Sequence, residues 1–180
     1  MGAPKALARD ADGTSWVVRT ARVLAEAGCG PVVVVVGAAA EQVMTELADE
    51  PVEVIEAGDW QEGMGATLRA GLAALANHPE PVAALVVPID LPGLGTAVVR
   101  RIAADADPGA LTRAVYRSSP GHPVLLGRDH WAGVIATAVG DQGARSYLRQ
   151  HPAREIECSD LADGADVDTP DQLPAGHRPS

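Results

Sequence analysis

The hydrophobic pattern of the chain alternates between short aliphatic runs and stretches of helical periodicity. The runs at 32–36 and 82–87 lack polar alternation, as expected for strands covered by helices on both faces. Apolar positions in 16–25 recur at helical spacing, with Ser15 before them and Gly28 as a stop. The remaining pattern predicts helices at 40–48, 64–76, 96–104, 129–139 and 144–150, and strands at 52–55, 111–116, 123–126 and 154–158. This alternation predicts an α/β layered fold with a mostly parallel sheet.

The length and composition indicate one domain with an aliphatic core. The chain has 180 residues, enough for a sizeable core without disulfides, and it shows no repeat or linker. Hydrophobic residues make up 47% of it, but there is no Phe. We predict a single domain over 1–173 and a frayed, disordered tail over 174–180.

The net charge narrows the possible partners. At −10, the chain repels the phosphates of nucleic acid polymers and anionic lipids, which excludes both as expected partners. No apolar run approaches the roughly 20 residues of a membrane span. A small anionic substrate stays compatible, because a bound cation can reverse the local sign. Cys29 and Cys158 lack metal or redox spacing and no signal segment opens the chain, so we expect reduced thiols in a cytoplasmic protein.

Candidate chemistry lies in the loops that follow the strands, where open α/β sheets form their ligand crevice. Asp90 follows the strand at 82–87 and could hold a magnesium ion that bridges substrate phosphates. The alternative is a purely structural role for this aspartate, in a turn or as a helix cap. Asp166 and Asp168 form an acidic cluster ended by Pro170. They could complete a magnesium site or cap a last short helix.

Glycines mark two further loops. Gly63, Met64 and Gly65 open a predicted helix, so that backbone N–H groups could approach an anion or a base; a plain turn is the alternative. The segment 140–143 and His122 complete the candidates, although a loop histidine is more often structural than catalytic. No Ser-His-Asp or Cys-His order stands out, and the histidines are too scattered to predict zinc.

Six motifs in a fixed order carry a family resemblance. They are Met1-Gly2-Ala3-Pro4-Lys5-Ala6-Leu7, Asp59-Trp60-x-x-Gly63-Met64-Gly65-x-x-Leu68, Asp90-x-Pro92, Gly121-His122-Pro123, Gly140-Asp141-Gln142-Gly143-Ala144-Arg145 and Asp166-Val167-Asp168-Thr169-Pro170. Together they resemble the molybdenum cofactor cytidylyltransferases, within the wider superfamily of MobA-like NTP transferases. The resemblance runs from Met1 to about Leu173. It implies a three-layer α/β/α, Rossmann-like nucleotidyltransferase fold.

The resemblance also implies a reaction and a set of roles. A phosphate-type group on the acceptor would attack the α-phosphorus of a nucleoside triphosphate, with Mg²⁺ as cofactor and pyrophosphate as the leaving group. Asp90 would be the principal metal ligand, completed by Asp168 or Asp166, and Lys5 would join Asp90 in catalysis. The implied nucleotide-binding residues are Gly2, Pro4, Lys5, Gly63, Met64, Gly65 and Asp90. The implied acceptor-binding residues are His122, Asp141, Gln142 and Gly143.

The expected substrates are CTP and a molybdopterin-type cofactor, in support of a molybdoenzyme. Two alternatives stay open: transfer of GMP or another nucleotide to a different phosphorylated acceptor, and a non-catalytic module that holds a nucleotide or cofactor for delivery. Where the family usually has Gly-Asp-Gln-Pro, this chain has Ile89-Asp90-Leu91-Pro92, which could alter substrate preference.

The N-terminus departs further from the family. Met1 falls on the Met of the family's R-M-G motif, so the preceding strand and glycine-rich loop are missing from these 180 residues. We expect a gap in the middle of the sheet, weak catalysis and a true start further upstream.

Overall fold

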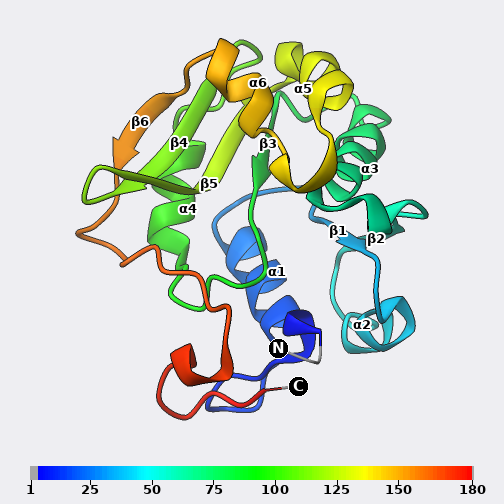
Figure 1. The fold of residues 1–180 in the computed structure, drawn as a ribbon, viewed down its shortest axis with the longest axis vertical. Helices are drawn as coiled ribbons and strands as arrows, with labels where there is room; N and C mark the ends of the chain where they lie inside the picture. Colours follow the sequence, from blue (N-terminus) through cyan, green and yellow to red (C-terminus); the bar gives the residue numbers. More distant parts are fainter. Residues whose placement is uncertain (1–3, 180) are drawn as a thin grey trace.

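A computed structural model describes residues 4–179 of the chain as an α/β fold (Figure 1). Gly2, one of the predicted nucleotide-binding residues, lies outside the described residues. The helices are α1 (Trp16–Glu26), α2 (Ala40–Glu46), α3 (Met64–Ala76), α4 (Thr96–Ala103), α5 (Trp131–Thr137) and α6 (Arg145–Gln150). The strands are β1 (Val33–Val36), β2 (Glu53–Glu56), β3 (Ala83–Val86), β4 (Leu111–Tyr116), β5 (Ser119–Gly127) and β6 (Arg154–Glu157). Short 3-10 turns occur at η1 (Lys5–Leu7), η2 (Trp60–Glu62), η3 (Arg128–His130), η4 (Gly140–Gln142) and η5 (Pro170–Gln172). The α/β class predicted from the sequence is confirmed.

The strands form two separate sheets. β1 pairs in parallel with β2, and the other sheet has the order β3-β5-β4-β6. Within it β4 and β6 are parallel, whereas β5 is antiparallel to both β3 and β4. In the part of the chain that the structure describes, no ladder joins β1 to β3.

β5 is longer than the sequence predicts and reverses the chain direction in the sheet. It begins at Ser119 rather than at Pro123, and only Arg117 and Ser118 connect it to β4. Both connecting residues have positive φ, 52° and 66°, as a two-residue hairpin turn requires. So short a connection can join only antiparallel strands, which explains why the sheet is mixed.

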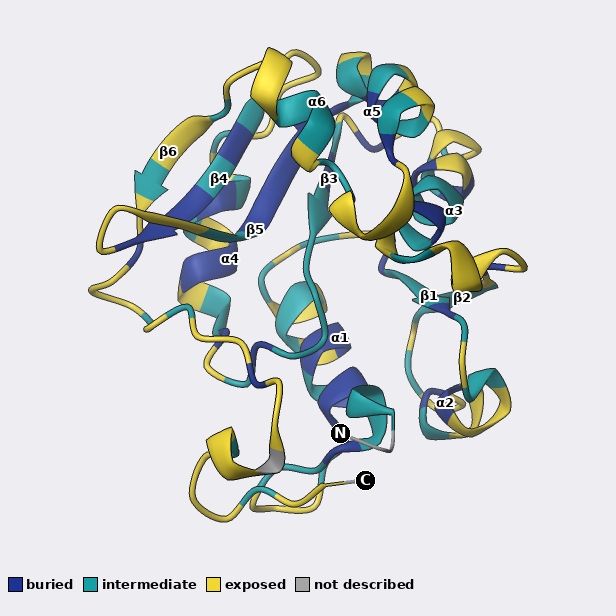
Figure 2. Cartoon of the chain, in the orientation of Figure 1, coloured by how far each residue is buried: buried dark blue, intermediate teal, exposed yellow. Residues whose placement is uncertain are grey.

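The helices bury three aliphatic clusters against these sheets (Figure 2). α4 covers β4 and β5 through Val98 and Ile102, and α1 and α2 close over β1. α3 and α5 pack together around Leu72 and Val134. All three clusters contain mainly Ala, Val and Leu, in line with the composition. Within residues 4–179, none of the helices combines the length and apolar character needed to cross a membrane.

The C-terminal tail contacts the N-terminal segment. Residues 176–178 lie against residues 9–11 and Trp16. The backbones of Arg9 and Arg178 exchange two hydrogen bonds, of 2.9 and 2.8 Å. His177 Nδ1 lies 3.3 Å from Asp10 Oδ1. These contacts attach the tail to the N-terminal segment, and most of its residues are exposed.

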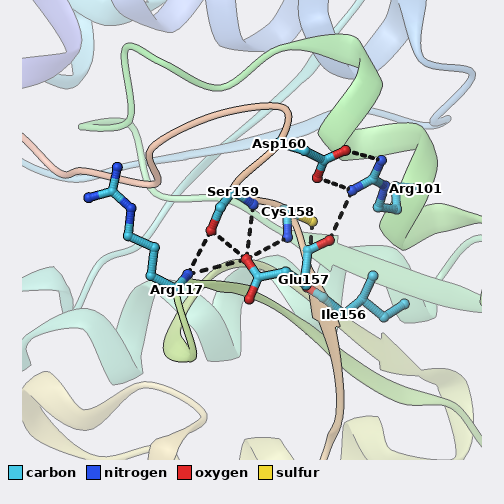
Figure 3. Close-up of polar contacts among 7 residues, drawn as sticks. All are labelled: Arg101, Arg117, Ile156, Glu157, Cys158, Ser159 and Asp160. Carbon is cyan, nitrogen blue, oxygen red and sulfur yellow. Dashed lines mark hydrogen bonds and ion pairs between the residues drawn. The ribbon is translucent and has the colours of Figure 1, made fainter.

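The corner after β6 is fixed by the carboxylate of Glu157 (Figure 3). It accepts hydrogen bonds from the backbone N–H groups of Ser159 at 3.0 Å and Arg117 at 3.2 Å, and from the Ser159 hydroxyl. These hydrogen bonds, chiefly the two from Ser159, lower the pKa of Glu157 to about 2. Arg101 forms a bidentate salt bridge with Asp160, with N···O distances of 2.6 and 2.9 Å. This corner attaches the following segment, 160–168, to the hairpin and to α4.

The Glu157 carboxylate predicts a pH dependence of stability. Because its pKa is depressed in the folded state, its contribution is present above the usual value near 4.5 and is lost as the pH falls toward 2. We expect Glu157→Gln to lower the Tm at pH 7 and to reduce the fall in Tm between pH 5 and 2, measured by circular dichroism. Glu155→Gln is the control, because that carboxylate pairs with the Arg113 side chain instead. Equal pH profiles for Glu157→Gln and wild type would contradict this account.

Candidate active site

Three predicted site residues from distant parts of the chain meet at one point. Lys5 lies in η1, Asp90 follows β3 and Asp168 belongs to the C-terminal segment. Lys5 Nζ lies 2.9 Å from Asp90 Oδ2 and 2.7 Å from Asp168 Oδ1. These contacts span 85 and 163 positions of the sequence. The folded chain therefore aims two carboxylates at one position, which the Lys5 ammonium occupies.

The ionisation of this cluster follows from its contacts. Burial lowers the pKa of Lys5, but its hydrogen bonds to Asp168 and Asp90 outweigh burial and raise the pKa. The hydrogen bond from Lys5 lowers the pKa of Asp168. Lys5 is therefore charged and Asp168 ionised at neutral pH. The Asp168 side chain is 66% exposed and Asp90 only 22%, so the cluster opens to solvent on the Asp168 side.

The C-terminal segment is seated on the loop that carries Asp90. Val167 N–H donates to the Asp90 carbonyl oxygen at 2.9 Å, and the Val167 side chain is buried with Ala8 and Trp16. The backbone N–H groups of Asp168 and Thr169 donate to Gln172 Oε1 at 2.7 and 2.9 Å. The Gln172 side chain thus binds these N–H groups, and the Asp168 carboxylate turns toward Lys5 instead of capping η5.

The apolar neighbours of Asp90 face the core. Leu91 is buried in the cluster around α4, and Ile89 packs against the clusters around Val17 and Trp16. The departure from the family's Gly-Asp-Gln-Pro at these two positions therefore adds packing. Asp90 stays directed at Lys5.

His122 and Asp166 lie near the cluster without joining it through a hydrogen bond to Lys5. Burial lowers the pKa of His122, although Asp90 and Asp166 act in the opposite direction. His122 is accordingly neutral at pH 7. Its carbonyl oxygen accepts a 2.8 Å hydrogen bond from the Tyr116 hydroxyl. Asp166 is exposed and contributes charge near His122.

The two predicted binding loops, 63–65 and 140–143, form one unit. Gly63 has φ of 104°, and a Cβ there would run into the Asp141 carboxylate and lie 2.9 Å from the Gly140 carbonyl oxygen. A Cβ at Gly65 would lie 2.9 Å from the Ala138 carbonyl oxygen. Only glycines permit this approach.

Arg69 of α3 fastens this unit, and sequence reasoning missed it. It donates to the Ala138 carbonyl oxygen at 2.7 Å and pairs with Asp59 and Glu62 at 2.6 and 2.7 Å. Met64 and Val139 are 56% and 59% exposed beside this unit, so it presents apolar surface to solvent. Glu62 lies in η2, before α3 begins, so no helical spacing in the sequence indicates this pair.

The donor set limits the metal that the site could hold. The described part of the chain contains no group of three or more His, Cys, Asp or Glu side chains suited to a metal ion. Asp90 and Asp168 alone supply two hard oxygen ligands. Mg²⁺ is commonly bound by one or two carboxylates, with waters and substrate phosphates in the other positions, so the two aspartates fit it.

A strand-end carboxylate that meets a second carboxylate and a lysine, together with a glycine loop at a helix start, is the set of residues expected of a nucleotidyltransferase. Comparison with known proteins agrees, since residues 1–155 match the MobA-like NTP transferase domain. The chain belongs to that family.

Individual relatives cover most of the chain. Nicotine blue oxidoreductase of Paenarthrobacter nicotinovorans is 37% identical over 170 residues, which span 89% of this chain and 82% of that protein. The crystal structure of Rv0371c from Mycobacterium tuberculosis H37Rv superimposes with a TM-score of 0.80 at 28% identity, covering 95% of this chain and 87% of that one. A manganese complex of Rv0371c gives 0.77 at 27% identity, covering 94% and 89%. These matches confirm the predicted Rossmann-like nucleotidyltransferase fold.

The contact between the two loops predicts a cost for enlarging Gly63. We expect Gly63→Ala to lower the free energy of unfolding by about 1–3 kcal/mol, because alanine disfavours positive φ and its Cβ meets Gly140 and Asp141. Urea denaturation measures the change. Gly58→Ala is the control, since no atom lies within 4 Å of a Cβ at that position. Equal stability of the two variants would show that the loops do not pack as described.

Proposed function

We propose that this nucleotidyltransferase transfers CMP from CTP to a molybdopterin-type cofactor and releases pyrophosphate. The observation that carries the proposal is the convergence of Lys5, Asp90 and Asp168 at one point. The order of motifs shared with the cytidylyltransferases supports the choice of CTP and of the acceptor. A molybdoenzyme would then receive the product.

The chemistry needs alignment and charge neutralisation more than a protein nucleophile. An oxygen of the acceptor phosphate attacks the α-phosphorus, and the bond between the α-phosphorus and the pyrophosphate oxygen breaks. Asp90 and Asp168 would hold Mg²⁺, which when bound supplies positive charge to the phosphate oxygens. Lys5 would exchange its carboxylate partners for triphosphate oxygens, acting as a point charge. Pro4 precedes Lys5 in the same turn and would shape the approach to those phosphates.

The glycine loops would bind the two substrates on adjoining surfaces. Gly63, Met64 and Gly65 would admit the base and ribose at the start of α3. The acceptor would contact Asp141, Gln142 and Gly143, with neutral His122 offering a hydrogen bond. Because Gly63 touches Gly140 and Asp141, the two binding loops would adjust together. Asp166 would add charge at the acceptor side or complete the metal site.

Transfer of GMP or another nucleotide to a different phosphorylated acceptor would use the same residues. A second candidate from another class rests on the 37% identity to a protein named nicotine blue oxidoreductase. By that analogy the chain would oxidise or reduce a ring compound such as nicotine blue. The exposed Met64 and Val139 would then offer apolar surface to the ring.

Pyrophosphate release separates these candidates. With Mg²⁺ and molybdopterin cofactor, we expect turnover with CTP above that with GTP, ATP or UTP. Asp90→Asn should reduce turnover by about 100-fold or more, the scale on which a charge-stabilising group acts. The Tm should change little, since part-exposed ion pairs contribute at most about 1 kcal/mol. Asp107→Asn, in an exposed turn, is the control.

Each of the other candidate functions predicts a different result in these assays. Pyrophosphate release with another nucleotide would reassign the base preference. Oxidation or reduction of nicotine blue, with no pyrophosphate released from any nucleotide, would favour the oxidoreductase. Folded protein that is silent in both assays yet binds nucleotide would be the delivery module.

A further inference from the structure

Arg19 of α1 reaches across to the loop that follows Asp90. Its Nη1 donates to the carbonyl oxygen of Leu94 at 3.4 Å, and its Nη2 donates to that of Leu91 at 3.3 Å and also to that of Pro92. Arg19 Nε lies 3.2 Å from Asp10 Oδ2. One side chain thus binds three carbonyl groups of a single turn and one carboxylate.

We infer that Arg19 is a positioning residue that fixes the direction of the Asp90 carboxylate. The inference rests on the proposed role of Asp90 in metal and nucleotide binding. Asp90 immediately precedes the three clamped carbonyl groups. The carbonyl oxygen of Asp90 itself accepts a 2.9 Å hydrogen bond from the Val167 N–H group. The turn is therefore held by α1 on one side and by the C-terminal segment on the other.

The energetics favour a role in positioning over a role in stability. Only 16% of the Arg19 side chain is exposed, and burial lowers its pKa, with Asp10 acting in the opposite direction. A charge removed from water is costly unless it is fully hydrogen-bonded, and apolar replacements of similar size are often neutral or stabilising. A guanidinium, however, is the side chain whose planar set of donors can bind several carbonyl oxygens at once.

Loss of this clamp should displace Asp90 more than it disturbs the core. Leu91 and Leu94 anchor the turn in the cluster around α4, so the fold keeps their packing without Arg19. The backbone between them would lose three hydrogen bonds and could rotate. Small misplacements of a binding group are sufficient to reduce catalysis about 100-fold.

The test compares two variants of the full 180-residue chain, Arg19→Met and Arg22→Met. Arg22 lies one turn further along α1, where it pairs with Glu50 and is 55% exposed. The readouts are the Kd for Mn²⁺ alone, by electron paramagnetic resonance, and kcat and KM for pyrophosphate release. We expect Arg19→Met to weaken Mn²⁺ binding and kcat by about 10–100-fold, as losses of supporting residues around metal ligands do. Arg22→Met should leave both near wild type.

Arg19→Lys keeps the charge but not the planar donors, so it should fall between Arg19→Met and wild type. If Arg19→Met does not fold, Arg19→Lys carries the test. Wild-type Mn²⁺ affinity and kcat in the folded Arg19 variants would overturn the inference. Weaker Mn²⁺ binding in a chain without pyrophosphate release would retain the Arg19 role and refute the transferase. If the wild-type chain does not bind Mn²⁺, both the role of Arg19 and the proposed transferase function are overturned.

Discussion

The Lys5 ammonium, held between the carboxylates of Asp90 and Asp168, is the contact on which the account depends. It joins the N-terminal turn, the end of β3 and the C-terminal segment at distances of 2.9 and 2.7 Å. With Asp168 66% exposed, solvent screens the pair, so it contributes too little to stability to explain the arrangement. In the proposed function these two carboxylates are the ligands of a metal ion, which would take the position of the Lys5 ammonium.

Several contacts outside the cluster hold Lys5, Asp90 and Asp168 in position. α1 reaches the Asp90 turn through Arg19, and Val167 holds the turn from the other side. The Glu157 corner attaches the segment leading to Asp168, while Arg9 and Arg178 join the two ends of the chain. The site is thus built from contacts distant in sequence. The glycine loops at 63–65 and 140–143 form a second unit, which would present the substrates to it.

The sequence predicts those features that local patterns determine. Uninterrupted valines at 32–36 and helical periodicity in 64–76 placed β1 and α3 within a residue of their observed ends. The order of motifs predicts Lys5, Asp90 and Asp168 as site residues, and the structure brings these three together. The start of β5 was missed because Ser119-Pro120-Gly121 has turn composition, and only pairing with β4 makes it a strand. Arg19 looks like any polar residue of an amphipathic helix, and the tail pairs through backbone groups that leave no side-chain pattern.

Anomalous diffraction from a crystal grown with Mn²⁺ and a non-hydrolysable CTP analogue tests the central claim most directly. The account predicts an anomalous peak within about 2.5 Å of carboxylate oxygens of both Asp90 and Asp168, with Lys5 turned to the triphosphate. A peak at another position, or Lys5 still bridging the two aspartates beside a bound nucleotide, would contradict it.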